Sequence, residues 1–422
     1  MDNIVYFHGA KVSLAPFFVI FYAWEQRELG ECMETVTDYV AAGSFADIAE
    51  NVQYKTFPDF AQLIRTVDLK HEFKNNDYIY VDKKAFDYLW KVNLNVECII
   101  LPNIGANIGE VYYIEPSSLP YENNVLGPNA IFLKAKDSTK FMYTLLQADD
   151  FQNKLYVSIA SSGQPKFNKT ELKAIKILIP NSAEQEKIGA YFRTLDHLIT
   201  LHQRKCETLQ KLKKSMLQKM FPKNGSCFPE IRFAGFTDAW ELRELGDIVG
   251  IYDGVHQTPN YQNSGIMFLS VENIATLKSS KFISEEDFKR DYKVYPQEND
   301  ILMTRIGDVG TTNVVTDNGL KAYYVSLALL KYKGTDPYFL SNAIQSDYVQ
   351  KGLANRTLKT AIPMKINKDE IGKVSVMLPL SATEQQQIGT YFRTLDHLIT
   401  LHQRKLETLK KLKKAMLQKM FI

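Results

Sequence analysis

The chain has 422 residues, of which 45% are hydrophobic and 23% are charged. This balance is typical of a globular protein with two or three domains and excludes a chain too polar to bury a core. The formal net charge of +3 neither requires nor excludes a nucleic-acid partner, because a nearly neutral molecule can carry a basic groove.

The first strongly apolar segment, 14–24, is about half as long as a bilayer crossing requires. It contains Pro16 and no small-residue cleavage box follows it, so we prefer a buried strand to a signal peptide. The cysteines form no close pair in the sequence; they are Cys32, Cys98, Cys206 and Cys227. They therefore indicate neither a metal site nor a redox pair, and they favour the reducing cytoplasm, away from any membrane.

Two segments, 23–183 and 240–383, carry the same order of patterns. Each has an opening peptide, an apolar run into an Ile-Gly turn, an amphipathic helix pattern and a closing peptide. The corresponding pairs are 23–31 with 239–247, 98–109 with 300–310, 141–151 with 338–348, and 165–180 with 364–379. Apolar residues alternate at the end of each closing peptide, which predicts a terminal strand. We expect two tandem α/β domains, each built on a twisted sheet.

A long repeat follows each of these segments. Glu184–Phe221 and Glu384–Phe421 are identical at 32 of 38 positions, with an offset of 200 residues. Neither copy contains proline, and neither contains glycine after Gly189 or Gly389. Good helix formers dominate, with acidic residues at the start and lysines at the end, which complement a helix dipole. Each copy is therefore predicted to be one long helix.

Apolar residues in both copies recur at alternating steps of four and three, which indicates a heptad seam. The expected packing residues are Ile188, Phe192, Leu195, Ile199, Leu209 and Met216, with Ile388, Phe392, Leu395, Ile399, Leu409 and Met416. A histidine (His202, His402) and a lysine (Lys213, Lys413) interrupt each seam, and we interpret the histidines as packed residues that set the register.

The simplest arrangement packs the two helices on each other as a coiled coil. At about 1.5 Å per residue each helix would be roughly 57 Å long. Antiparallel packing places each lysine-rich end beside the more acidic start of the other helix, so we expect an antiparallel, pseudo-twofold symmetric pair. The predicted segments are an atypical 1–22, a first domain 23–183, a helix 184–221, a linker 222–239, a second domain 240–383 and a helix 384–422.

This layout, with YFRTLDHLITLHQRK in both helices, resembles the specificity subunit of type I restriction-modification enzymes. Supporting motifs are SSGQPKFNKTELK at 161–173, ILMTRIG at 301–307 and YVSLALL at 324–330. One departure is that the family-like peptide FPEIRFAGFTDAW at 228–240 precedes only the second domain. Residues 1–22 do not fit the pattern, so their role is open.

The resemblance implies an α+β chain with two target-recognition domains, each reading half of a split double-stranded DNA site. The helices would set the gap between the halves. Two methyltransferase subunits and restriction and translocation subunits would join this chain. The complex would use S-adenosylmethionine, ATP and Mg²⁺, none of them bound by this chain, which would be a non-catalytic subunit in the cytoplasm.

Catalytic motifs are absent from the sequence, in agreement with that role. There is no G-x-x-x-x-G-K-S/T phosphate loop, no H-E-x-x-H, and no Asn/Asp-Pro-Pro-Tyr/Phe peptide of the kind that holds a flipped adenine. Alternatives remain open: a single-chain enzyme, a coiled-coil adaptor without a DNA role, and an orphan or shuffling cassette that supplies alternative specificity.

Two loops in each domain combine residue types that contact bases and phosphates. The candidate DNA-binding residues are Asn103, Asn107, Gln164, Lys166, Asn168, Lys169, Arg305, Thr311, Thr312, Arg356, Lys359 and Lys365. The alternative is that these loops are ordinary polar surface turns. The Asn-Lys pair recurs at 168–169 and 367–368, which favours a structural or phosphate-contacting role. The helix lysines are expected to face solvent or partner subunits, and the half-sites should differ and lie about one helical turn apart.

Overall fold

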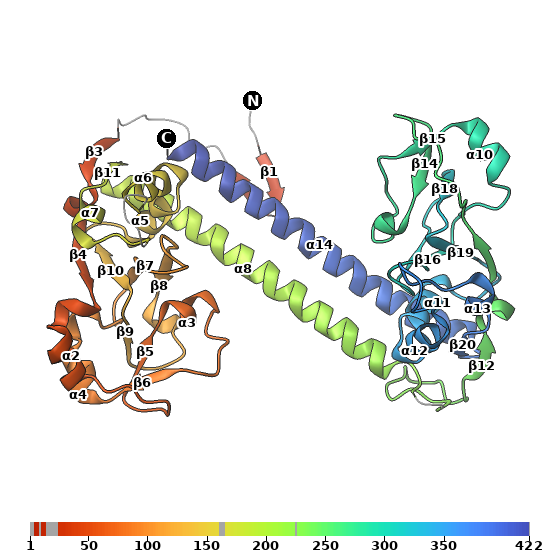
Figure 1. Cartoon of the computed structure of the whole chain (residues 1–422), viewed down its shortest axis with the longest axis horizontal. Coiled ribbons are helices and arrows are strands. Elements are labelled where there is room, and N and C mark those ends of the chain that lie inside the picture. The colour runs from red at the N-terminus through yellow and green to blue at the C-terminus, as the bar shows by residue number, and fades with distance from the viewer. Residues whose placement is uncertain (1–3, 8–9, 14–23, 160–164, 224–225, 422) are drawn as a thin grey trace. The chain divides into compact units, whose positions relative to one another are not determined.

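The computed structural model describes residues 4–7, 10–13, 24–159, 165–223 and 226–421. These residues belong to two compact units (Figure 1). Unit 1 spans 1–201 and 407–422, and unit 2 spans 202–406. Each unit therefore contains one globular domain together with a stretch of both long helices. The strand expected within 14–24 lies outside the described residues except for Trp24, and the described parts of 1–22 form a short hairpin of β1 (Ile4–Phe7) and β2 (Ala10–Ser13).

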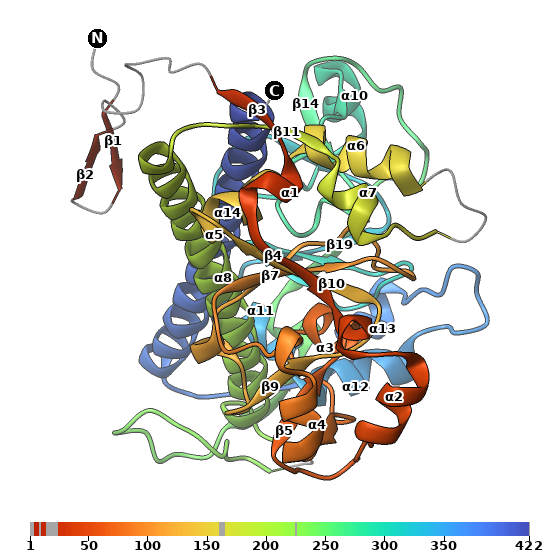
Figure 2. The ribbon, with the colours of Figure 1, turned by 90° about the vertical axis from the view of Figure 1, so that its left-hand side faces the viewer.

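Unit 1 has three further sheets. A two-stranded antiparallel pair joins β3 (Glu25–Glu28) to β11 (Lys176–Ile179). A four-stranded antiparallel sheet has the order β4 (Met33–Asp38), β10 (Ala130–Ala135), β7 (Cys98–Pro102) and β8 (Tyr112–Ile114). Its strands β4, β7 and β10 are labelled in Figure 2. A three-stranded mixed sheet has the order β6 (Ile79–Val81), β5 (Ala61–Ile64) and β9 (Asn124–Leu126).

Unit 2 repeats this topology sheet by sheet. The pair is β12 (Glu241–Glu244) with β20 (Ser375–Leu378). The four-stranded sheet is β13 (Gly250–Asp253), β19 (Leu327–Lys331), β16 (Ile301–Thr304) and β17 (Thr312–Val314). The mixed sheet is β15 (Phe282–Ile283), β14 (Ile266–Leu269) and β18 (Lys321–Tyr323). The weak correspondence between the two segments of sequence is therefore a correspondence of folds, and the expected closing strands are confirmed as β11 and β20.

Apart from the two long helices, the helices of unit 1 are short except where they support the four-stranded sheet. They are α1 (Leu29–Cys32), α2 (Phe45–Asn51), α3 (Thr66–Lys70), α4 (Lys83–Tyr88), α5 (Thr139–Leu146), α6 (Asp149–Ile159) and α7 (Lys169–Lys173). In unit 2 they are α9 (Leu245–Ile248), α10 (Glu285–Asp291), α11 (Pro337–Ile344), α12 (Asp347–Arg356) and α13 (Lys368–Gly372). The short 3-10 helices are η1 (Tyr39–Ala42), η2 (Trp90–Val92), η3 (Pro116–Ser118) and η4 (Val271–Asn273).

The central strand β7 is apolar throughout because it is buried on both faces. Ile99 and Leu101 pack into the core beside α5 and α6, whereas Cys98 and Ile100 pack into a second core over the mixed sheet. Successive side chains of a strand point to opposite faces, so a strand between two cores has no polar alternation. The same division occurs in β16 of unit 2.

Both repeat copies are helical, as predicted: α8 spans Ser182–Lys219 and α14 spans Ala382–Met420. The glycine near the start of each copy has a packing reason. A Cβ at Gly189 would lie 2.6 Å from the backbone nitrogen of Phe141, and one at Gly389 would lie 2.9 Å from that of Phe339. The long helices therefore pass directly against the first turns of α5 and α11, where only glycine fits.

Within each unit the two long helices contact each other and run in opposite directions. In unit 2, His202 Nδ1 lies 2.8 Å from His402 Nδ1. Further along α8, Lys213 Nζ lies 2.6 Å from Asp396 Oδ1, and Asp396 precedes His402 in α14. The lysine that interrupts the apolar seam therefore forms an ion pair across the helix interface, and Lys413 does the same with Asp196 in unit 1, also at 2.6 Å.

Candidate nucleic-acid interface

Two loops meet in the same way in both units. We call 102–109 and 304–311 the turn loops, and 165–168 and 357–367 the closing loops. A single antiparallel bridge joins the loops in each unit, Ile104 with Lys166 in unit 1 and Ile306 with Lys365 in unit 2. The backbone nitrogen of Phe167 donates to Asn103 (3.2 Å), and that of Ile366 donates to Arg305 (3.0 Å). The closing loop is therefore hydrogen-bonded to the turn loop in the same register in both units.

Asn103 and Arg305 occupy corresponding positions, and both side chains reinforce this junction. The amide of Asn103 donates to the carbonyl oxygen of Phe167 at 3.1 Å. The Arg305 Nε donates to the carbonyl oxygen of Ile366 at 3.0 Å, and its guanidinium also pairs with Asp253. Arg305 is only 5% exposed. Its charge is thus used inside the domain, where it holds both loops against β13.

Glycines with positive φ shape each turn loop. They are Gly105 (97°) and Gly109 (81°) in unit 1, and Gly307 (80°) and Gly310 (98°) in unit 2. Other residues are strained in this conformation. The carbonyl oxygen of the second glycine accepts a hydrogen bond from a helix glutamine, Gln152 in unit 1 (3.1 Å) or Gln350 in unit 2 (3.0 Å).

Sequence reasoning missed these two glutamines. A signal for them exists, since each is the last residue of an Asp-x-x-Gln peptide that begins α6 or α12, at Asp149 and Asp347. Each glutamine also donates to the carbonyl oxygen at the end of the preceding helix, at 2.6 Å in unit 1 and 2.8 Å in unit 2. Each glutamine thereby fixes the turn loop to the helix pair of its unit, α5 and α6 or α11 and α12.

Besides Asn103, three other sequence candidates in unit 1 have structural partners. Asn107 Oδ1 accepts a hydrogen bond from Lys70 at 2.6 Å. Asn168 caps α7, with its side-chain oxygen 2.8 Å from the backbone nitrogen of Thr170. Lys169 forms an ion pair with Asp38 at 2.7 Å. These contacts support the structural alternative for the Asn-Lys peptide in unit 1.

Lys166 of unit 1 is exposed, and it has no ion pair within the described part of the chain. The candidate Gln164 lies outside the described residues. Lys166 is thus the candidate that the unit 1 loops present most freely to a ligand.

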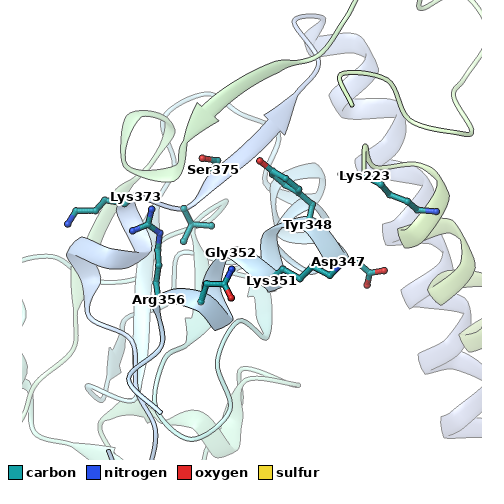
Figure 3. Close-up of a pocket in the computed structure, with 10 residues that line it drawn as sticks. Lys223, Asp347, Tyr348, Lys351, Gly352, Arg356, Lys373 and Ser375 are labelled. Atoms are coloured by element: carbon teal, nitrogen blue, oxygen red, sulfur yellow. The ribbon is translucent and has the colours of Figure 1, made fainter. Parts of the chain in front are cut away.

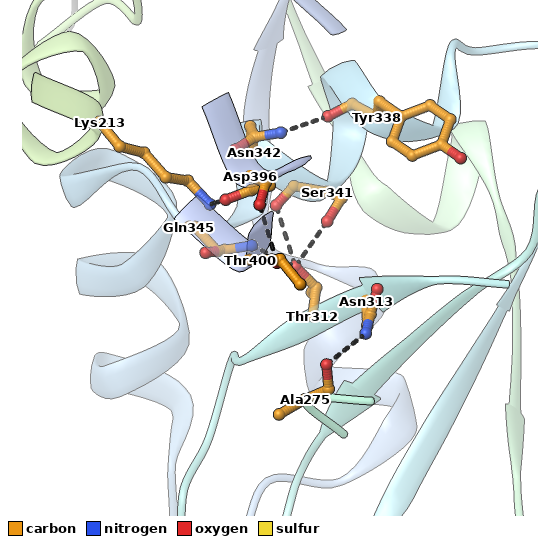
Figure 4. Close-up of polar contacts among 10 residues, drawn as sticks. All are labelled: Lys213, Ala275, Thr312, Asn313, Tyr338, Ser341, Asn342, Gln345, Asp396 and Thr400. Carbon is orange, nitrogen blue, oxygen red and sulfur yellow. Dashed lines mark hydrogen bonds and ion pairs between the residues drawn. The ribbon is translucent and has the colours of Figure 1, made fainter. Parts of the chain in front are cut away.

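In unit 2 the candidates divide between the interior and the surface. Thr312 is 8% exposed, and its hydroxyl lies 2.9 Å from both Ser341 Oγ and the side-chain nitrogen of Gln345 (Figure 4). Thr311 is exposed, and its backbone nitrogen donates to the hydroxyl of Thr304 at 3.0 Å. Thr312 therefore joins the four-stranded sheet to α11, while Thr311 lies on the outer surface.

The three basic candidates of unit 2 other than Arg305 lie in two different places. Arg356 lines a surface pocket of about 650 Å³ with Lys351 and Lys373 (Figure 3). Glu370 partly neutralises this pocket, since it pairs with Lys373 at 2.7 Å and with Arg356 at 3.0 Å. These two cations lower the pKa of Glu370, the lysine first. Lys359 and Lys365 instead lie on the closing loop, both exposed.

The predicted packing residues of the long helices are buried or partly buried. In unit 1 these are Ile188, Phe192, Leu195 and Leu409, with Ile199 and Met416 partly buried. In unit 2 they are Leu209, Ile388, Phe392, Leu395 and Ile399, with Met216 partly buried. Phe192 and Phe392 are wholly buried, so each long helix also belongs to the core of a globular domain.

Two further surveys apply to the described residues alone. Among them, no three or more His, Cys, Asp or Glu side chains are grouped so that they could hold a metal ion. Among them too, no helix is both long enough and apolar enough to cross a membrane.

Known proteins resemble this chain over most of its length. The profile of the type I restriction modification DNA specificity domain matches residues 24–211 and 237–411. The MjaVIII type I restriction enzyme specificity subunit of Methanocaldococcus jannaschii is 22% identical, covering 78% of this chain and 79% of that protein. The MjaIX specificity subunit of the same organism is 21% identical, covering 83% of this chain and 84% of that protein.

A solved structure supports the fold. The S subunit of the type I restriction-modification system from M. genitalium matches with a TM-score of 0.64 at 15% sequence identity, over 96% of this chain and 98% of that one. Because the profile covers both domains and most of both long helices, the chain belongs to the family of type I restriction-modification DNA specificity subunits.

Proposed function

We propose that this chain gives a type I restriction-modification enzyme its DNA address, and that each unit reads one half of an asymmetric two-part site. One observation carries the proposal: the same hydrogen-bonded frame of turn loop and closing loop recurs in both units. Its exposed side chains differ between the units, apart from a shared lysine and asparagine (Lys166 and Asn168, Lys365 and Asn367). A constant frame positions a domain on the phosphate backbone, and variable side chains read the base edges. Two frames with different side chains suit two different DNA words.

The long helices α8 and α14 form the spacer between the two readers in this proposal. Their buried seam and their crossed Lys–Asp pairs support an antiparallel coiled coil with pseudo-twofold symmetry. Such a spacer would hold the half-sites about one helical turn apart, so that both domains face the same side of the duplex. The base pairs between the half-sites would be left unread.

The proposed partners are two methyltransferase subunits together with restriction and translocation subunits, acting on double-stranded DNA in the cytoplasm. S-adenosylmethionine, ATP and Mg²⁺ are assigned to those subunits, and addressing and scaffolding to this chain. The exposed faces of the long helices, rich in lysine near their C-terminal ends, are the surfaces on which we expect partner subunits to dock.

Among the candidate residues we assign the direct DNA contacts to Lys166 in unit 1, and to Thr311, Lys359 and Lys365 in unit 2. The buried Arg305 and Thr312 and the partly buried Asn103 have a different role, since they hold the loops in place. A cation already paired inside the domain would leave an uncompensated carboxylate behind if it moved out to DNA.

The test measures binding of the complex with its methyltransferase subunits to a target duplex across a range of salt concentrations. Each phosphate contact that is lost should lower the salt slope by about 0.9. The double substitution Lys359→Ala with Lys365→Ala should therefore lower the slope by about two and weaken binding to all sequences alike.

Lys333→Ala is the matched control. Thr304 pairs with Leu327 and Ile301 with Leu330, so the turn loop follows one end of β16 while Lys333 lies beyond the opposite end of β19. This exposed lysine should leave the slope unchanged. An equal effect of the control and the double variant would contradict the assignment.

A further inference from the structure

The closing loop of unit 2 presents an apolar tip. Leu358 and Lys365 exchange two backbone hydrogen bonds, with N–O distances of 2.8 and 3.4 Å, and so close a six-residue hairpin tip. Ile362 at this tip is 100% exposed, and Leu358 and Met364 are each 45% exposed. A single exposed apolar residue is ordinary, but three within seven residues form a patch that usually marks a contact surface.

This hairpin is held firmly at its base. The backbone nitrogen of Gly307 donates to the carbonyl oxygen of Met364 at 2.8 Å, and the backbone nitrogen of Ile366 donates to the carbonyl oxygen of Arg305 at 3.0 Å. The buried Arg305 side chain adds a third bond, to the carbonyl oxygen of Ile366. The apolar tip is therefore presented from the same frame that we propose lies on the DNA.

The surroundings of the tip are strongly basic. Between Arg356 and Lys368 the sequence RTLKTAIPMKINK contains four cations and no acidic residue. Arg356 pairs with Glu370, whereas Lys359, Lys365 and Lys368 are exposed and have no ion pair within the described residues. An exposed apolar side chain surrounded by unpaired cations suits a ligand that has negative charges on its surface and apolar groups between them.

We propose that Ile362 acts as a wedge that enters between two stacked base pairs of the half-site read by unit 2. The interior of a DNA duplex is a stack of flat apolar faces between two rows of phosphates. Proteins that bend DNA insert isoleucine, leucine or methionine in this way, with basic residues on the neighbouring phosphates. The inference rests on the proposed function. It adds a residue that recognises DNA by how easily the DNA deforms.

Two consequences follow for specificity. Pyrimidine–purine steps unstack most easily, so the half-site of unit 2 should contain a TA or CA/TG step at the wedge position, without a hydrogen bond to its bases. The corresponding peptide of unit 1, SSGQPK at 161–166, contains no large apolar residue. The wedge therefore belongs to one half-site only.

The experiment uses the full chain in complex with its methyltransferase subunits and a duplex of the mapped target. Purines of the second half-site are replaced one at a time by 2-aminopurine, which fluoresces more strongly when it unstacks. The adenine that becomes methylated should unstack separately, because it is flipped out for the reaction. That signal reports a productive complex, so its loss would count against the proposed function and not against the wedge.

The wedge predicts a second unstacked step, away from the methylated adenine. Ile362→Ser should abolish that signal and weaken binding about tenfold, the order expected for one apolar side chain lost from an interface. Ile362→Leu should preserve both. Because the side chain touches solvent alone in the free protein, neither substitution should disturb folding. Tyr332→Ser is the matched control, since Tyr332 is 48% exposed next to Lys333, beyond the opposite end of the sheet.

Either of two results would overturn the wedge. The first is a bound complex in which the methylated adenine alone unstacks, or in which the second signal survives Ile362→Ser. The second is failure of the Ile362→Ser chain to copurify with its methyltransferase subunit, which would make the hairpin a protein contact.

Discussion

A buried ion pair in unit 2 offers a quantitative test of how the second domain is built. The carboxylate of Glu384, at the start of α14, is 1% exposed. Arg232 donates two hydrogen bonds to it, at 2.7 and 2.8 Å, and the indole of Trp240 donates a third at 3.3 Å. Arg232 and Trp240 belong to the peptide 228–240, so this cluster explains what that peptide does: it seals the start of the long helix.

Glu384→Ala would remove the acceptor and leave a largely buried guanidinium without its partner. Breaking a buried pair from one side costs about 3–5 kcal/mol. The Arg232 side chain retains 14% exposure, so water replaces part of the lost interaction and we expect about 3 kcal/mol. For a unit of this size each kcal/mol shifts the midpoint by about 2–4 °C, which gives a decrease of about 6–12 °C for unit 2.

The chain contains its own control. Glu184 occupies the same position in α8, is partly exposed, and forms no ion pair among the described residues. Glu184→Ala should therefore cost less than about 0.5 kcal/mol. Scanning calorimetry of the full chain should resolve the change as a shift of one transition, because two units need not unfold together. Replacement of both partners, Arg232→Met with Glu384→Leu, should restore most of the stability. Equal shifts for Glu384→Ala and Glu184→Ala would refute the reasoning.

Two further predictions concern the helix pair in unit 2. Lys213→Asp alone should lower the free energy of unfolding by about 1 kcal/mol, and the exchange Lys213→Asp with Asp396→Lys should recover most of that loss. A double-mutant cycle measured by chemical denaturation tests this prediction. No recovery in the exchanged variant would show that the ion pair does not stabilise the helices. Burial and then the neighbouring lysines Lys405 and Lys205 lower the pKa of His402 below its usual 6.5. The unfolded chain therefore binds a proton more readily, and stability should fall as the pH decreases through about 6.5. His402→Gln should flatten this dependence between about pH 7 and pH 5.5, and an unchanged slope would contradict the assignment.

The helical part of the fold could be predicted well because its signals are local. The heptad pattern and the repeat identify both long helices, and the burial of Phe192 and Phe392 follows from that pattern. The role of Lys213 could not be predicted, because an ion pair across two helices depends on a register that one sequence does not specify. The packing of Gly189 against Phe141 depends in the same way on a neighbour in another element.

The sheets were predicted only in outline. The closing strands were found from alternation, but β5 pairs in parallel with β9, more than fifty residues away, and three-residue strands have no period to detect. The interface shows the same limit. Arginine is a residue type that reads base edges, yet Arg305 forms an ion pair with Asp253, which lies 52 positions away in the sequence. The exposure of Ile362 is likewise a property of the hairpin and not of the local sequence, since an isoleucine in an alternating peptide is normally buried.

The most direct test of the central claim is to map modified adenines across the genome of a methylation-free host that expresses this chain with its methyltransferase subunit. The account predicts a single motif made of two different short words with a fixed unread spacer. It also predicts that exchange of the second domain alone changes one word and leaves the other. No modification despite a stable complex, or one continuous palindromic word, would contradict it.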